Sequence, residues 1–205
     1  QAAPRNVLFN AGEEVSQEQL GLRYRKRPAA HQELTITAHM LHRDFQNRLP
    51  FTDGGQAQFD RWVGGLALQF EHNHTVLERP NRLLVGVDYG MQNDDRRRFN
   101  NNDGARGALT LNQLERVQSV GPFFRNEWRV MKDVDVVAGG RWDWLHYQVN
   151  DAFKTDGNQS GSRTLSQGSG TAGLVYHLNN HQQIYTNVAS VFEAPTTTEL
   201  LNNPA

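Results

Sequence analysis

Apolar and polar residues alternate with a period of two in most segments of this chain. In the segment 133–143, Val134, Val136 and Trp142 fall on one side, while Asp135 and Arg141 fall on the other. This alternation predicts strands with one apolar and one polar face. We predict eight strands, around residues 20–26, 34–40, 62–70, 83–91, 120–130, 133–143, 172–178 and 184–192.

The links between these strands alternate between short and long. Short links fall at residues 27–32, 72–81, 131–133 and 178–183, and long polar links fall at residues 44–56, 93–113 and 151–167. An up-and-down antiparallel meander places all its short turns at one rim and all its long loops at the other. The sequence therefore predicts an all-β meander of about eight strands.

Two settings fit strands whose second face is polar. A soluble sheet buries its apolar face against a partner layer, whereas a transmembrane barrel turns that face to lipid. The unequal loops favour the barrel, and so do Trp62, Tyr89, Trp142 and Trp144, which lie near strand ends where an aromatic girdle is expected. Alternation alone leaves both settings open.

Composition narrows the possibilities. The 205 residues have a mean hydropathy of -0.69, which is low for a protein with a conventional sealed core. The net charge of -1 provides no basic surface for nucleic acid, which is not expected as a partner. Because there is no cysteine, disulfides and thiolate metal sites are excluded. No run approaches the roughly 18 apolar residues of a membrane-spanning helix.

Four stretches resemble consecutive pieces of one known barrel. They are LGLRYRKRPAAHQELTITAHMLHRDFQNRLPF, LLVGVDYGMQNDDRRRFNN, FFRNEWRVMKDVDVVAGGRWDWLHYQVND and IYTNVASVFEAPTTTEL. Together they resemble the barrel of TonB-dependent outer-membrane receptors, the siderophore-type iron transporters of Gram-negative bacteria. The most specific signals are residues 126–129, 138–143 and 191–200. The resemblance covers nearly the whole chain.

The resemblance implies a plugged barrel of about 22 strands, located in the outer membrane of a Gram-negative bacterium. We interpret residues 1–205 as a partial barrel domain, with the plug domain and the C-terminal strands absent. The implied function is TonB-driven uptake of ferric siderophores or similar metal chelates. The implied partners are such a chelate, the TonB complex through the missing N-terminal region, and outer-membrane lipid. No cofactor or resident metal is expected.

The sequence contains no constellation for catalysis. It lacks a glycine-rich phosphate loop, a nucleophile elbow and an HExxH motif, so no enzyme activity is expected. Asp94 and Asp95 would point to opposite faces of a strand, and we interpret them as part of a solvated loop. His72 and His74 would share a strand face as a metal pair, but their place in a short link favours a polar turn.

Arg96, Arg97 and Arg98 are the candidate substrate-binding residues at the extracellular rim. Guanidinium groups form charge-assisted, bidentate contacts that suit the carboxylate, catecholate or hydroxamate oxygens of a ferric chelate. In the alternative interpretation, Asp94 and Asp95 neutralise them in a strand extension, where exposed ion pairs contribute about 0–1 kcal/mol. The sequence alone leaves both interpretations open.

A rival function is a self-contained small barrel or soluble β-sandwich that acts as a binding module or adhesin, since eight strands can close a small barrel. Pairing between the strands at 20–26 and 184–192 would favour this rival. An open, curved sheet with two free edges would favour a section of a larger barrel. At Pro122 we expect a bulge or a late strand start, because proline lacks a donor for the ladder.

Overall fold

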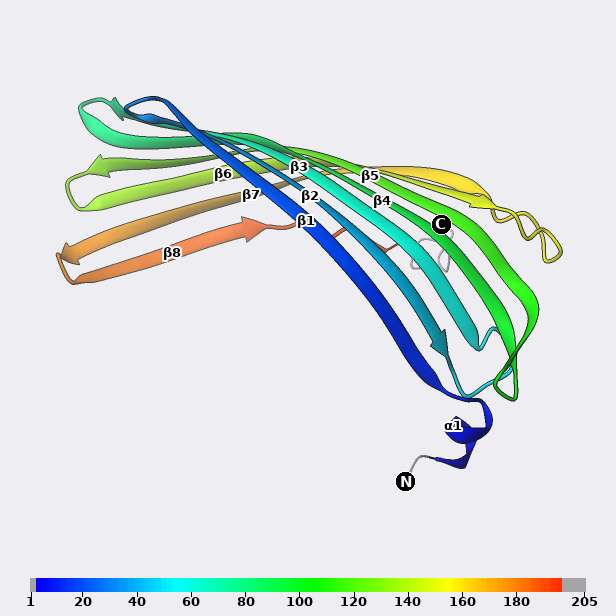
Figure 1. The fold of residues 1–205 in the computed structure, drawn as a ribbon. Coiled ribbons are helices and arrows are strands. Elements are labelled where there is room, and N and C mark those ends of the chain that lie inside the picture. The colour runs from blue at the N-terminus through cyan, green and yellow to red at the C-terminus, as the bar shows by residue number, and fades with distance from the viewer. Residues whose placement is uncertain (1–2, 197–205) are drawn as a thin grey trace.

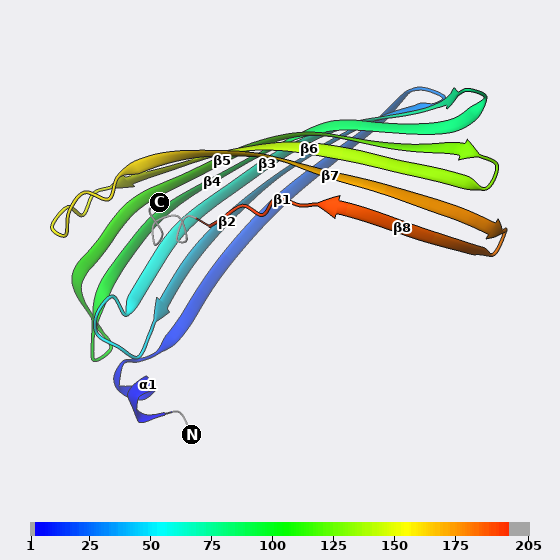
Figure 2. The same cartoon turned by 180° about the vertical axis from the view of Figure 1, so that it is seen from behind.

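A computed structural model describes residues 3–196, which form one antiparallel sheet of eight strands after a short helix. Neighbouring strands follow the sequence order, which confirms the predicted meander. The elements are α1 (Pro4–Leu8), β1 (Gly12–Ala29), β2 (Gln32–Arg48), β3 (Gln56–Val76), β4 (Arg79–Asn102), β5 (Ala105–Met131), β6 (Val134–Asp151), β7 (Gly161–Asn179) and β8 (Gln182–Ser190). The sheet bends into an arch (Figures 1 and 2).

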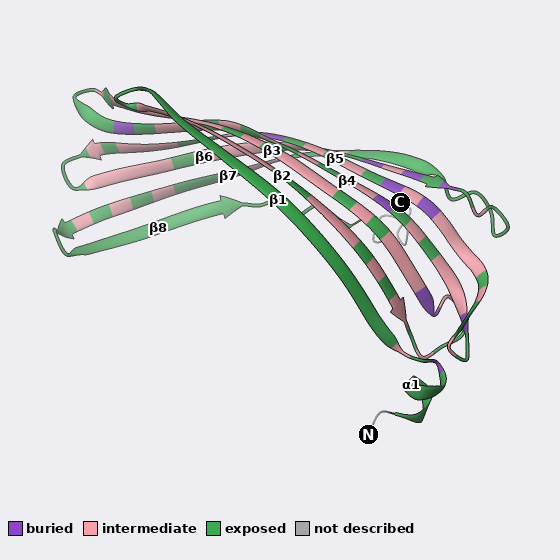
Figure 3. Cartoon of the chain, in the orientation of Figure 1, coloured by how far each residue is buried: buried purple, intermediate pink, exposed green. Residues whose placement is uncertain are grey.

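The sheet is open at both edges. β1 and β8 stand at opposite ends of the strand order, and no ladder joins them in residues 3–196. Both edge strands are exposed along their whole length (Figure 3). A closed eight-strand barrel and a two-layer sandwich therefore do not describe this fold. Within the same residues, no helix has the length and apolar character needed to cross a membrane.

The strand register collects the apolar residues on the convex face. Leu68 of β3 lies opposite Val87 of β4, which in turn lies opposite Pro122 of β5. Because each strand keeps its alternation in phase with its neighbours, the apolar positions merge into a continuous band. The exposed band includes Leu20, Leu22, Met40, Leu66, Leu68, Val85, Val87, Tyr89, Met91, Val120, Phe124, Trp142, Trp144, Leu174, Tyr176, Ile184 and Val188.

The concave face is polar, and there is little conventional core. Among the described residues, the buried apolar side chains are only Phe9, Tyr147 and Val149. Buried polar side chains outnumber these three apolar ones. They are Gln56, Asn81, Asp94, Asn101, Gln113, Glu115 and Asp151. The ladder hydrogen bonds and polar pairs on the concave face therefore connect the strands where a sealed core would otherwise do so.

The short links all lie at one rim, as predicted, but one of the three long links is not a loop. Two-residue turns at 30–31, 77–78, 132–133 and 180–181 form the first rim. At the other rim, β2–β3 and β6–β7 are joined by residues 49–55 and 152–160. The expected loop at 93–113 is instead paired strand, because β4 and β5 extend to a turn at Asp103 and Gly104. Their φ angles of 50° and 92° fit a type I′ hairpin turn.

Pro122 causes neither a bulge nor a late strand start, so that expectation is wrong. β5 runs without a break from Ala105 to Met131, and Pro122 pairs with Val87 of β4. On the β6 side, the ladder skips Gly121 and Pro122 without a change of register. Proline is accommodated here because its missing N–H falls where the ladder has no pairing.

Candidate functional site

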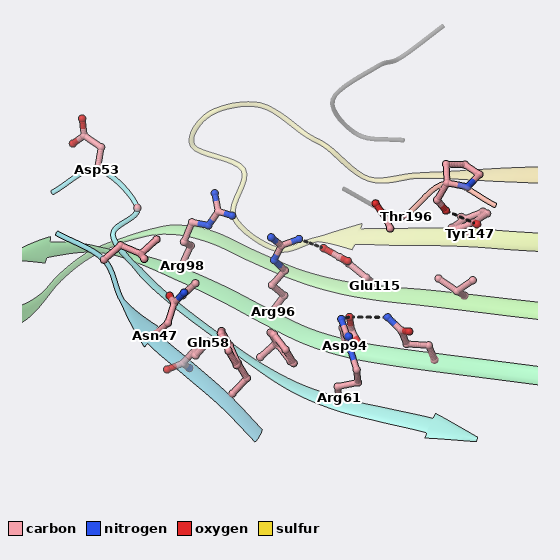
Figure 4. A pocket seen from close by; sticks show the side chains of 18 of the residues that line it. Asn47, Asp53, Gln58, Arg61, Asp94, Arg96, Arg98, Glu115, Tyr147 and Thr196 are labelled. Atoms are coloured by element: carbon pink, nitrogen blue, oxygen red, sulfur yellow. Dashed lines mark hydrogen bonds and ion pairs between the residues drawn. The ribbon is translucent and has the colours of Figure 1, made fainter. Parts of the chain in front are cut away.

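A cavity of about 560 Å³ lies on the concave face at the rim with the long hairpins. Strands β2 to β6 form its walls, the β2–β3 link lies at its mouth, and residues 195–196 cover part of it (Figure 4). Its polar lining comprises Asn47, Asp53, Gln58, Arg61, Gln92, Asp94, Arg96, Arg98, Glu115, Tyr147 and Thr196. This is the candidate functional site.

Alternation along β4 decides which of the predicted arginines reach the cavity. Because successive strand residues point to opposite faces, Arg96 and Arg98 line the cavity. Arg97 lies on the convex side, where its Nη2 is 2.9 Å from Asp95 Oδ2. The three consecutive arginines therefore do not form one binding cluster. The pairing of Arg97 with Asp95 agrees with the alternative interpretation for that residue alone.

Asp94 is the most completely enclosed charge in the site, with 1% of its surface exposed. Its two oxygens accept hydrogen bonds from Arg61 Nε at 2.8 Å and Arg61 Nη2 at 2.5 Å. Gln92 Nε2 donates a third bond at 3.0 Å. Bidentate geometry makes this a strong charge-assisted pair. The interpretation of Asp94 as a solvated loop residue that neutralises the arginine cluster is therefore wrong, since its partner is on β3.

Arg96 and Arg98 differ in how their charges are balanced. Arg96 Nη1 lies 3.2 Å from Oε1 of Glu115, which is buried on β5. No ion pair or hydrogen bond of the Arg98 side chain is found within residues 3–196. Burial, followed by the nearby charge of Arg96, lowers the pKa of the Arg98 guanidinium, and Glu115 partly opposes this shift. Arg98 is therefore the guanidinium best placed to meet an anion.

Aromatic side chains complete the walls. Phe45 and Phe59 are cross-strand partners whose rings stack with centroids 4.7 Å apart. Tyr147, which is 5% exposed, donates a hydrogen bond from its hydroxyl to the backbone oxygen of Pro195 at 2.8 Å. This contact holds the segment after β8 against the cavity wall. Sequence patterns did not reveal these residues, because the strand register brings them together from distant positions.

The β2–β3 link is fixed to the end of β4. Gly54 N donates to Asn100 Oδ1 at 3.1 Å, and Asn101 N donates to the backbone oxygen of Thr52 at 2.8 Å. Gly54 has a φ of +65°, and a Cβ there would lie 3.1 Å from Arg98 Cδ. The link therefore packs closely on Arg98 and borders the mouth of the cavity.

His72 and His74 are strand residues, so their assignment to a turn is wrong. β3 continues to Val76, and the turn itself consists of Leu77 and Glu78. The two imidazole rings stack with centroids 4.8 Å apart, at the opposite rim from the cavity. Among the described residues, no group of three or more histidine or carboxylate side chains is arranged to hold a metal ion.

The TonB-dependent receptor-like β-barrel family matches residues 4–205 of the chain. The chain belongs to the TonB-dependent receptors. Members of this family are Gram-negative outer-membrane transporters and are not enzymes. The resemblance deduced from the sequence, the outer-membrane location and the absence of enzyme activity are thereby confirmed. The match extends over residues 197–205, which lie outside the described residues together with the end of the motif at 191–200.

Solved TonB-dependent receptors share the fold. Unliganded ferric citrate transporter FecA matches with a TM-score of 0.74 and 13% identity, over 85% of this chain and 27% of that one. The siderophore receptor PiuA from Acinetobacter baumannii matches with a TM-score of 0.72 and 12% identity, over 88% of this chain and 33% of PiuA. The copper transporter OprC matches with a TM-score of 0.74 and 15% identity, over 95% of this chain and 33% of OprC. The chain thus spans at most about a third of these structures.

Proposed function

We propose that this receptor captures an anionic metal chelate, a ferric siderophore or a similar complex, in the concave cavity and imports it with energy from TonB. Arg98 is the observation that carries the proposal. The guanidinium is half-buried, lies next to the positive charge of Arg96 and has no ionic partner in the described chain. An anionic ligand would supply the missing negative charge.

The ion pairs of the neighbouring arginines support one uncompensated cation in the cavity rather than a diffuse basic surface. Arg61 is held by Asp94, and Arg96 is held by Glu115. Asp53 also lines the cavity, but no ion pair joins it to Arg98 within residues 3–196. Arg96 then acts mainly through its charge, while Arg98 retains N–H donors for the carboxylate, catecholate or hydroxamate oxygens of a chelate.

The remaining parts of the proposal concern the whole receptor. We interpret residues 1–205 as part of the wall of a larger barrel, because the sheet has two open edges and an apolar convex face suited to lipid. TonB would act through a region outside this chain. FecA is a ferric citrate transporter, PiuA a siderophore receptor and OprC a copper transporter, which supports a metal-containing substrate here.

The test compares Arg98→Ala with Arg97→Ala in the full-length protein that contains this chain, purified in detergent. Hydrogen bonds to a charged group contribute about 1.5–3 kcal/mol, so Arg98→Ala should weaken the binding of a ferric chelate by roughly 10- to 100-fold. Arg97→Ala should leave affinity unchanged, because Arg97 faces the convex side. Equal affinities of the two variants for iron(III) citrate and for an iron(III) catecholate would refute the assignment of Arg98.

A further inference from the structure

The Phe45–Phe59 stack ends beside the cavity with one aromatic face available. The Arg61 guanidinium carbon lies 4.6 Å from the Phe59 ring centroid, and Phe45 stacks on Phe59 with an interplanar angle of 13°. Phe59 is therefore packed between Arg61 and Phe45. Phe45 has only Val15 as its partner on β1, and Val15 is itself about half exposed. Phe45 thus offers the aromatic surface that remains.

A small residue separates this stack from Arg98. Ala57 pairs with Arg98 on β4 and with Asn47 on β2, two ladder positions beyond the Phe45–Phe59 pair and therefore on the same face. The methyl group of Ala57 leaves space above the sheet between the larger side chains. Asn47, Phe45, Ala57 and Arg98 all line the same cavity.

Asn47 adds a polar group that lacks a partner. Its Oδ1 is buried and has no hydrogen-bond partner in the described chain. A buried acceptor without a donor costs about 1–3 kcal/mol, so a ligand that brings a hydroxyl or amide N–H would relieve this cost. The cavity therefore presents, around Ala57, an aromatic face, a cation and a hydrogen-bond acceptor.

We infer that this group of residues is an aryl subsite: an aromatic ring packs on Phe45, an ionised oxygen of that ring meets Arg98, and a neighbouring hydroxyl or amide N–H donates to Asn47 Oδ1. The inference rests on the proposed function and names its substrate class. The preferred chelates carry phenolate or catecholate rings. Purely aliphatic carboxylate chelates satisfy Arg98 but leave Phe45 and Asn47 Oδ1 without contacts.

The experiment measures the dissociation constants of two probes with the full-length protein in detergent. The iron(III) complex of dihydroxybenzoate is the aryl probe, and iron(III) citrate is the aliphatic one. The unmodified protein should bind the aryl probe at least about tenfold more tightly. Phe45→Leu should weaken aryl binding roughly three- to tenfold, the factor expected for a lost aromatic pair, and should leave citrate binding within about twofold. Phe45→Tyr keeps the ring and should restore the preference.

Phe70→Leu is the matched control, because Phe70 is an aromatic residue of the neighbouring strand β3 that pairs with Val85 of the convex apolar band. It should change the affinity for neither probe. Equal affinity of the unmodified protein for both probes, or equal weakening of both by Phe45→Leu, would overturn the aryl subsite. Binding of citrate alone overturns it while leaving the proposed function intact. Binding of neither probe overturns both, and since the comparison of probes needs no variant, a misfolded Phe45→Leu does not obscure the result.

Discussion

The side-chain amide of Asn101 donates a hydrogen bond to the backbone oxygen of Phe9 at 2.9 Å, and so ties the segment before β1 to the far end of β4. The same nitrogen donates to the backbone oxygen of Leu49 at 3.0 Å. The side-chain oxygen accepts bonds from Gln56 Nε2 and Gly104 N. Asn101 has 0% exposure. One buried, fully bonded amide therefore holds four separate pieces of the rim.

Asn101→Ala should loosen this rim without unfolding the sheet. The substitution leaves several buried backbone groups without partners, at a cost of about 1–3 kcal/mol. The expected result is faster amide hydrogen exchange around Phe9, Leu49 and Gly104, with unchanged exchange in the centre of the strands. Asn102→Ala is the control, because Asn102 lies on the same hairpin but is exposed. Similar exchange in the two variants would contradict the role given to Asn101.

The turn at Leu77 and Glu78 should be open to stabilisation. Both residues have positive φ, 49° and 60°, although neither is a glycine, asparagine or aspartate. A left-handed conformation costs such residues roughly 1–2 kcal/mol each, and type I′ turns favour Asn-Gly. Leu77→Asn combined with Glu78→Gly should raise the free energy of unfolding by about 1–2 kcal/mol in urea titrations. Unchanged or lower stability would show that the turn is not strained.

The sequence predicted the strands well where only one face was apolar. All eight were found, because lipid on one side and polar groups on the other impose a clear period of two. The ends of the strands were predicted poorly. Beyond Met91 both faces of β4 are polar, so hydropathy no longer distinguishes strand from loop, and Arg96 to Arg98 were assigned to a loop. The Asp103-Gly104 pair was the local signal for a hairpin that could have corrected this.

The candidate site was predicted only in part. Arg96 and Arg98 were identified because three adjacent arginines stand out in the sequence. Phe45, Arg61 and Tyr147 were not, because their relation to β4 depends on cross-strand register, which no local pattern encodes. The turn at Leu77 was missed for a different reason. It carries no turn-forming residue, so the link was predicted too long, at 72–81, and included His72 and His74.

Gly86 should tolerate no side chain. A Cβ at this position would lie 2.5 Å from Phe123 Cζ and 2.6 Å from the backbone oxygen of Leu68. The ring could move, but the β3 backbone could not do so without disturbing the ladder. Gly86→Ala should therefore lower the free energy of unfolding by about 1–3 kcal/mol, the usual cost of overpacking. Gly161→Ala, with no atom within 4 Å of the added Cβ, should be nearly neutral in the same denaturant titration.

Asp135 should make stability depend on pH in the acid range. Its hydrogen bonds with Arg129, at 2.7 Å and 3.1 Å, are the main cause of its lowered pKa, and His177 at 2.8 Å adds to it. Because the folded pKa lies below the unfolded value of about 3.9, the stabilisation is present above that value. It is lost as the pH falls through the folded pKa.

Asp135→Asn tests this dependence directly. Urea unfolding of the parent protein and the variant should differ by less than about 1 kcal/mol near neutrality, since Arg129 is well exposed. The difference should shrink as the pH falls below the unfolded value of about 3.9 and through the lowered folded pKa, where the parent carboxylate becomes protonated. Asp133→Asn is a nearby control at the β5–β6 turn. It should change the free energy of unfolding less than Asp135→Asn does. A difference that stays constant with pH would exclude this linkage.

The 205-residue chain should associate in water and disperse in detergent. Its convex face exposes a band of large apolar side chains, among them Leu20, Leu68 and Trp144, and an apolar surface of this extent favours association. The edges at β1 and β8 also carry unpaired backbone groups that can template pairing with other chains. Light scattering should therefore show large assemblies in buffer and smaller particles above the critical micelle concentration. A monomer that melts cooperatively without detergent would contradict a lipid-facing role for the band.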